Sequence, residues 1–246
     1  MQTNLEGKTV LVADAIRNFG GPTALAFARE KANLVLASRD DDDRLQRAAS
    51  EAASLGARAV THVCDIGDES QARALVRKAL DEFGHIDVLV NNLLLPVETL
   101  PLAQVSFELW KQKIDAEILG SVVLCREVLP SMIERRWGRV INFAGLAAFR
   151  GTDPLASTTE MGIIGLTRGI AREYGKYNIT ANCIGPGGIA TEEDSRQQAC
   201  PPGGHDALDR WGRPEEISFL AVSLASEDAG YLTGQCLLAN GGKHYL

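Results

Sequence analysis

Short apolar segments alternate with longer amphipathic segments along the whole chain. Several short segments are apolar at every position, which is typical of parallel strands covered on both faces. The longer segments, such as 70–83 and 161–177, have apolar residues at helical spacing. This alternation predicts right-handed crossovers and a doubly wound, Rossmann-like α/β sheet with helices on both faces. Seven strands are predicted, at 9–13, 33–37, 57–61, 87–91, 139–143, 179–184 and 235–239.

The pattern runs through 246 residues with no composition shift and no internal repeat, so residues 1–246 are predicted to form a single domain. One segment breaks the rhythm. Residues 191–207 contain an acidic run and the sequence Cys200-Pro201-Pro202-Gly203-Gly204. Long polar loops of this kind often cover a site, and this one follows a predicted strand at its carboxyl end. We therefore expect a lid at about 191–207.

The formal net charge of -7 argues against nucleic-acid and anionic-membrane partners, which both need a basic face. No apolar run is long enough to span a membrane, and the first residues do not resemble a secretory leader. The five cysteines are scattered without metal-ligand spacing, so no metal site is predicted. These features predict a cytoplasmic protein that acts on a small molecule.

A series of short motifs resembles the short-chain dehydrogenase/reductase family over residues 8–242. Each motif is weak alone, but their order and spacing together are specific. The resemblance implies a nicotinamide cofactor at the carboxyl ends of the strands, and a homotetramer or homodimer formed through the helices around 110–135 and 158–177. The motifs are Cys64-Asp65-Ile66, Asn91-Asn92, Gly165-Leu166-Thr167-Arg168, Pro186-Gly187-Gly188-Ile189-Ala190-Thr191, Tyr231-Leu232-Thr233-Gly234-Gln235 and Gly241-Gly242.

The phosphate-binding loop departs from the family pattern TGxxxGxG. Residues 13–20 read Ala-Asp-Ala-Ile-Arg-Asn-Phe-Gly, so Asp14 and Asn18 replace two glycines and only Gly20 remains. Such glycines let the backbone approach a pyrophosphate at a helix N-terminus. Asp14 adds a negative charge there, and Phe19 is bulkier than the usual residue. Asn18 tolerates a positive φ nearly as well as glycine does.

Other positions match the family's cofactor site. Ser38-Arg39 ends the second predicted strand, where an arginine favours the 2′-phosphate of NADP over NAD. Arg17 supplies a second basic residue. Two interpretations stay open: NADP binds, or the site has lost its cofactor. The residues implied in cofactor binding are Arg17, Asn18, Phe19, Gly20, Ser38, Arg39, Asp65, Ile66, Asn91, Pro186, Gly187, Ile189 and Thr191.

The family's catalytic residues, Asn, Ser, Tyr and Lys, are all replaced. The resemblance places Glu117 at the Asn position, Gly145 at Ser, Ala156 at Tyr and Glu160 at Lys. The chain has no tyrosine before Tyr174 and no lysine between Lys113 and Lys176, so a small alignment shift does not restore them. Ordinary carbonyl reduction then lacks its proton donor.

The replacements Glu117 and Glu160 suggest a new carboxylate pair. Two close carboxylates push one pKa upward, which gives one acid and one base. They could instead bind a divalent cation. The alternative is that each carboxylate faces solvent or pairs with an arginine such as Arg150 or Arg168. The sequence leaves these options open.

Residues 18–21, Asn-Phe-Gly-Gly, also resemble a loop of the halohydrin dehalogenases, which bind halide in place of nicotinamide. Those enzymes use a Ser-Tyr-Arg triad that Gly145, Ala156 and Glu160 do not supply. Three functions remain. The first is a non-redox lyase, hydrolase or isomerase that uses Glu117 and Glu160. The second is an NADP-dependent oxidoreductase with atypical catalytic residues. The third is a catalytically silent subunit, alone or in a hetero-oligomer with an active homologue.

Overall fold

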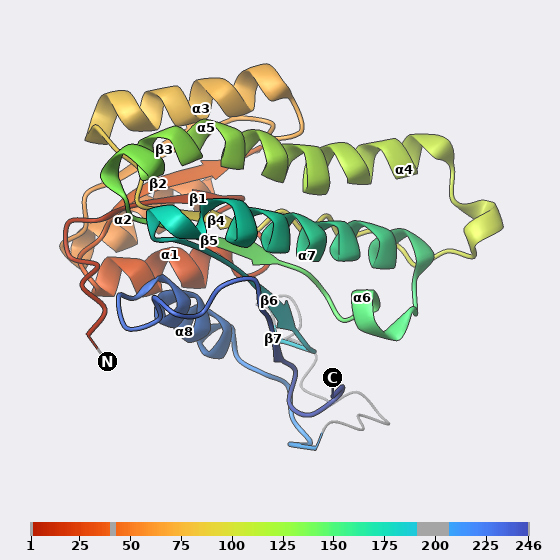
Figure 1. The fold of residues 1–246 in the computed structure, drawn as a ribbon. Helices are drawn as coiled ribbons and strands as arrows, with labels where there is room; N and C mark the ends of the chain where they lie inside the picture. Colours follow the sequence, from red (N-terminus) through yellow and green to blue (C-terminus); the bar gives the residue numbers. More distant parts are fainter. Residues whose placement is uncertain (1, 40–42, 191–206, 246) are drawn as a thin grey trace.

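The computed structural model describes residues 2–39, 43–190 and 207–245, and within them the predicted α/β fold is confirmed (Figure 1). Seven strands form one sheet in the order β3-β2-β1-β4-β5-β6-β7, and neighbouring strands pair in parallel. The order reverses between β1 and β4. The strands are β1 (Thr9–Ala13), β2 (Asn33–Ser38), β3 (Ala59–Val63), β4 (Val88–Asn91), β5 (Gly138–Phe143), β6 (Ile179–Pro186) and β7 (Cys236–Ala239).

Two apolar cores cover the two faces of the sheet. On β1, Val10 and Val12 face a core that includes residues from α1 (Gly20–Arg29), α2 (Asp43–Ser54) and α8 (Pro214–Ala225). The alternate residues Leu11 and Ala13 face a second core, built with α3 (Glu69–Phe83), α5 (Gly120–Arg135) and α7 (Pro154–Tyr174). Burial on both faces explains why the strands are apolar throughout rather than alternating. The described helices are all too short or too polar to cross a membrane.

The helices that border the site differ from the predicted ones in detail. Helix α7 begins at Pro154 rather than near 161, because the Asp153 carboxylate caps it by accepting from the N–H groups of Leu155 and Ala156. The predicted helix over 110–135 is α4 (Phe107–Lys113) joined to α5 through a π-helical turn, Ile114–Leu119. Such turns are frequent at functional sites. Shorter elements are α6 (Ala147–Arg150) and the 3₁₀ turns Leu102–Gln104 and Gly175–Tyr177.

Candidate functional site

The loop between β1 and α1 keeps a left-handed turn without its glycines. Asp14 has φ 59° and Asn18 has φ 49°, so both adopt the conformation that glycine favours at these positions. Aspartate and asparagine are the side chains that tolerate it best. Gly20 is required for a different reason: a Cβ there would lie 2.8 Å from the Ala15 backbone and closer still to the Asp14 carbonyl oxygen. The loop therefore adopts left-handed backbone at two of the replaced positions and keeps a glycine where the backbone comes closest.

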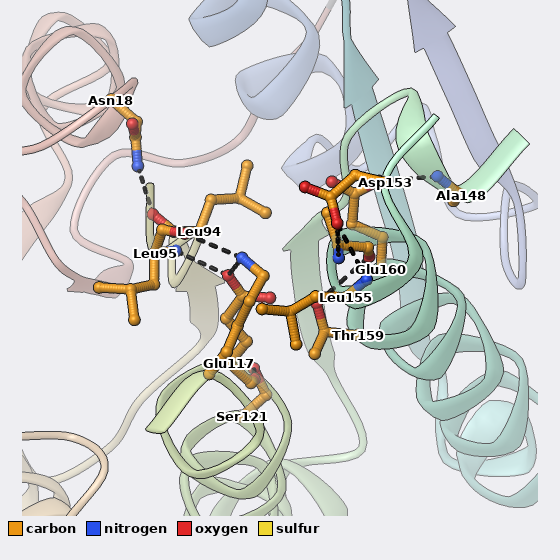
Figure 2. Close-up of polar contacts among 12 residues, drawn as sticks. Asn18, Leu94, Leu95, Glu117, Ser121, Ala148, Asp153, Leu155, Thr159 and Glu160 are labelled. Atoms are coloured by element: carbon orange, nitrogen blue, oxygen red, sulfur yellow. Dashed lines mark hydrogen bonds and ion pairs between the residues drawn. The ribbon is translucent and has the colours of Figure 1, made fainter. Parts of the chain in front are cut away.

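Side chains tie this loop to the exit of β4 across the point where the strand order reverses. The Asn18 amide donates to the Leu94 carbonyl at 2.9 Å (Figure 2). The Asn92 amide donates to the Asp14 and Arg17 carbonyls, at 2.8 Å each. Ligands of doubly wound folds bind in the crevice at this reversal. The Asn18–Leu94 hydrogen bond joins the two sides of that crevice.

Phe19 packs away from the crevice. Its ring stacks on Phe143 of β5 with centroids 5.6 Å apart, and its side chain is buried. The structure therefore gives Phe19 a packing role in the loop.

A small cavity of about 40 Å³ lies between the ends of β2 and β3 and the exit of β4. The Arg39 guanidinium pairs with the Asp65 carboxylate at 3.0 Å on the rim. The structure thus groups five of the residues predicted to bind the cofactor around one cavity. Its lining includes Arg17, Ser38, Arg39, Asp65, Ile66, Leu93, Leu94 and Leu95.

Asn91 braces the interior. Its buried amide donates to the Asn142 side chain on β5 at 2.8 Å, and the Asn142 amide donates to Thr167 on α7 at 2.8 Å. This network ties two strands to a helix. The structure thus supports bracing for Asn91, and its predicted cofactor contact stays a prediction.

The residues after β6 are also held by the fold. The Gly187 N–H donates to the Ala239 carbonyl, and a Cβ at Gly187 would lie 2.6 Å from the Asn240 Cα. Ile189 is buried and forms a bridge with Gly212, whereas Pro186 ends β6. Thr191 and the predicted lid up to residue 206 lie outside the described residues.

Glu117 lies in the π-helical turn and is only 1% exposed. Its Oε1 accepts from the Lys113 ammonium at 2.5 Å and from the Leu95 N–H at 2.7 Å (Figure 2). Lys113, itself 4% exposed, also donates to the Leu95 carbonyl. Sequence analysis missed Lys113, although its spacing four residues before Glu117 is that of a helical ion pair.

Glu160 on α7 is 7% exposed, and its carboxylate fills the space beside Gly145 at the end of β5. Its Oε2 accepts from the Ala148 N–H at 2.8 Å, and the Gly145 N–H also donates to the carboxylate. A Cβ at Gly145 would lie 2.9 Å from the Glu160 Cδ. Glu160 therefore occupies the space that a side chain at position 145 would need.

Glu117 and Glu160 have different electrostatic surroundings. Burial raises the pKa of Glu160, and the negative charge of Glu117 raises it further, against opposing hydrogen bonds from backbone N–H groups and the charge of Lys113. Lys113, in contrast, pairs directly with Glu117. The arrangement therefore favours the protonated form of the Glu160 carboxyl.

The structure does not show the alternative in which each carboxylate faces solvent or pairs with an arginine. Neither faces solvent, and the polar partners of Glu117 and Glu160 come from Lys113 and backbone groups rather than from Arg150 or Arg168. Among the described residues, no group of three or more His, Cys, Asp or Glu side chains could hold a metal ion. Ala156, at the tyrosine position, is half-buried and carries no titratable group.

Two thiols adjoin this site. Cys183 of β6 and Cys236 of β7 lie opposite one another in the sheet. The negative charge of Glu160 acts to raise the pKa of both thiols. A hydrogen bond from Cys183 and the charge of Arg168 lower the pKa of Cys236. Nothing in the cysteine spacing indicated this pair, because it depends on strand register.

Comparison with known proteins identifies the fold family. The family model described as enoyl-(acyl carrier protein) reductase matches residues 15–244. A 3-oxoacyl-[acyl-carrier-protein] reductase of Thermotoga maritima is 31% identical over 246 residues, which cover 97% of this chain and 98% of that protein. The chain belongs to the short-chain dehydrogenase/reductase family. A 2,5-dichloro-2,5-cyclohexadiene-1,4-diol dehydrogenase of Sphingobium indicum is 32% identical, with 98% of each chain covered.

Solved structures have the same fold as this chain. L-sorbose reductase from Gluconobacter frateurii, complexed with NADPH and L-sorbose, superposes with a TM-score of 0.90 at 27% identity, over 99% of this chain and 98% of that one. A metagenomic blue fluorescent protein in complex with NADPH gives 0.89 at 26% identity, over 98% of this chain and all of the other. These relatives favour the oxidoreductase hypothesis over the non-redox one. The resemblance to halohydrin dehalogenases stays a prediction.

Proposed function

We propose that this protein is an NADP(H)-dependent oxidoreductase in which the Glu160 carboxyl replaces the family's tyrosine as the proton-transfer group. The observation that carries this proposal is the position of Glu160. Its carboxyl lies at the carboxyl end of β5, in the space left by Gly145, and burial raises its pKa. A carboxyl with a raised pKa holds its proton to a higher pH than an exposed glutamate does, and it can serve as a general acid.

The adenosine end of the site fits the phosphorylated dinucleotide. Arg17, Ser38 and Arg39 line one cavity. We expect the two guanidinium groups to bind the 2′-phosphate of NADP there. Asp65 and Ile66 would border the adenine. The left-handed backbone at Asp14 and Asn18 preserves the turn that lets a pyrophosphate approach the start of α1. When bound, the cofactor supplies or accepts a hydride.

The residues around Glu160 have separate roles in positioning it and in setting its pKa. Lys113 neutralises Glu117 and, with Leu95, fixes the β4 exit against the π-helical turn. The negative charge of Glu117 helps Glu160 to retain its proton. The backbone N–H groups of Gly145 and Ala148 orient the Glu160 carboxyl. A substrate atom beside Gly145 would receive its proton from Glu160.

An NADPH-oxidation assay with a panel of small ketones, enones and cyclic imines tests the proposal. We expect turnover to fall as pH rises through the raised pKa of Glu160, because only the protonated carboxyl donates. Glu160→Gln should abolish turnover. Glu173→Gln removes the same charge from an exposed position on the same helix, so it should leave turnover unchanged. Full activity in Glu160→Gln would refute the role of this residue.

A catalytically silent subunit is the second candidate, because Gly145 and Ala156 supply no reactive group. Under it, the protein binds NADPH, while every substrate of the panel leaves the NADPH unoxidised.

We further propose a cytoplasmic homodimer or homotetramer formed through α4, α5 and α7. Exposed apolar side chains support this: Phe107 on α4 is 92% exposed, and Leu119 and Met161 are each 48% exposed. A monomer by light scattering would contradict it.

A further inference from the structure

The proposed site has one proton donor, the Glu160 carboxyl, where the family has several hydrogen-bond donors. The family's tyrosine and serine hydroxyls and its lysine ammonium are replaced here by Ala156, Gly145 and Glu160. Reduction of a carbonyl leaves negative charge on oxygen, which needs donors or cations nearby. After Glu160 has given up its proton, its carboxylate beside Gly145 would repel that charge. The polarity of the site is therefore reversed relative to the reaction of its relatives.

Glu117 also presents an unpartnered hydrogen-bond acceptor in the buried part of the site. Its Oε1 has two donors, whereas its Oε2 is buried and has no hydrogen-bond partner. A buried carboxylate oxygen without a donor is costly, so it calls for a partner. Figure 2 shows the Glu117 carboxylate between the β4 exit, with Leu94 and Leu95, and helix α7, with Leu155 and Glu160. The open acceptor thus lies in the site.

The charges of these groups favour a cation. Once Glu160 has given its proton to a ligand, its carboxylate and that of Glu117 face the single ammonium group of Lys113. The described residues offer no set of three metal ligands, and a metal would meet the Lys113 ammonium beside its carboxylate ligand. A ligand that donates hydrogen bonds and carries one positive charge fits both features. A protonated nitrogen has these properties.

We infer that the substrate of this oxidoreductase is an imine, bound and reduced as its iminium ion, and that the product is the corresponding amine. The inference rests on the proposed function. It also explains the absence of the family's serine and lysine, because an iminium carbon accepts a hydride without an oxyanion forming.

The reaction balances with the groups named. Glu160 transfers its proton to the imine nitrogen and becomes a carboxylate paired with the iminium. The carbon accepts a hydride from the reduced nicotinamide dinucleotide, which is oxidised. The hydride electron pair forms the new C–H bond, and the C=N π pair returns to nitrogen. The product is a neutral amine, and Glu160 regains a proton from water.

Piperidine and tetrahydropyran provide a matched pair of probes, because they share one shape and only piperidine is protonated near neutral pH. We would follow the backbone amide signals of Gly145 and Ala148 by NMR, since both N–H groups donate to Glu160. Piperidine should shift them with a Kd at least about tenfold below that of tetrahydropyran, a difference of about 1.4 kcal/mol. Glu160→Gln should remove the preference, and Glu173→Gln should keep it.

Equal or tighter binding of tetrahydropyran would overturn the inference. So would the absence of any shift with piperidine, or a preference that persists in Glu160→Gln. NADPH titrated into the same samples separates this test from the proposed function. A cation preference without NADPH binding removes the oxidoreductase and leaves a cation site. NADPH binding without the preference removes only the imine substrate.

Discussion

Restoring the family's serine at Gly145 should destabilise this protein, because Glu160 already occupies the space. A Cβ at Gly145 would lie 2.9 Å from the Glu160 Cδ and 3.1 Å from its Oε2, inside van der Waals contact. Overpacking of this kind costs about 1–3 kcal/mol. For a chain of this size, 1 kcal/mol lowers the melting temperature by about 2–4 °C. We therefore expect Gly145→Ser to melt roughly 2–12 °C below the wild type.

A double-mutant cycle identifies the cause. Glu160→Ala vacates the space, so Gly145→Ser should cost much less in that background, with a coupling energy of about 0.5–3 kcal/mol. Gly165→Ala is the control. This glycine is exposed on α7, and a Cβ there meets nothing within 4 Å, so the variant should gain about 0.5–1 kcal/mol. Additive costs of Gly145→Ser and Glu160→Ala in denaturant unfolding would refute the reasoning.

Four further predictions concern separate groups. Lys113→Met leaves the Glu117 charge buried and should lower the unfolding free energy by about 3–5 kcal/mol, most of which the double variant with Glu117→Gln should recover. Because the folded-state pKa of Glu160 is raised, its ionisation costs stability as pH rises. The stability of Glu160→Gln should therefore improve relative to wild type between pH 4 and 8, and a constant difference would contradict the shift. Cys236 should react with iodoacetamide before Cys125, whose burial raises the thiol pKa to about 12; mass spectrometry would show the order. Asn18→Gly keeps the turn and removes the tie to Leu94, so calorimetry should show tighter NADPH binding, and weaker binding would count against the crevice being spanned.

The fold could be predicted because the sequence repeats one physical pattern. Strands buried on both faces must be apolar throughout, and segments such as 9–13 and 139–143 show this directly. Element boundaries were less accurate. The start of α7 depends on the Asp153 cap and on Pro154, a signal that was present and was not used. The π-helical turn at Glu117 has no comparable signal in the residues.

The site could be predicted only in part. The motif positions placed Glu117 and Glu160 near one another, and the pKa of Glu160 responds to the charge of Glu117. Their partners depend on tertiary geometry. The hydrogen bond from the Leu95 N–H to Glu117 joins positions 22 residues apart in the sequence. The contact of Glu160 with Gly145 joins α7 to the end of β5. The substitutions at Asp14 and Asn18 left cofactor binding open in the sequence, and both residues adopt positive φ in the structure, as expected for Asn18.

Calorimetric titration of the purified protein with NADPH, and separately with NADH, tests the proposed oxidoreductase most directly. Arg17, Ser38 and Arg39 at the adenosine end predict saturable binding of NADPH that is at least about tenfold tighter than that of NADH. Arg39→Ala should remove this preference. Saturable NADPH binding with that preference would support a working dinucleotide site despite Asp14 and Asn18. No heat of binding with either dinucleotide would contradict the proposed function.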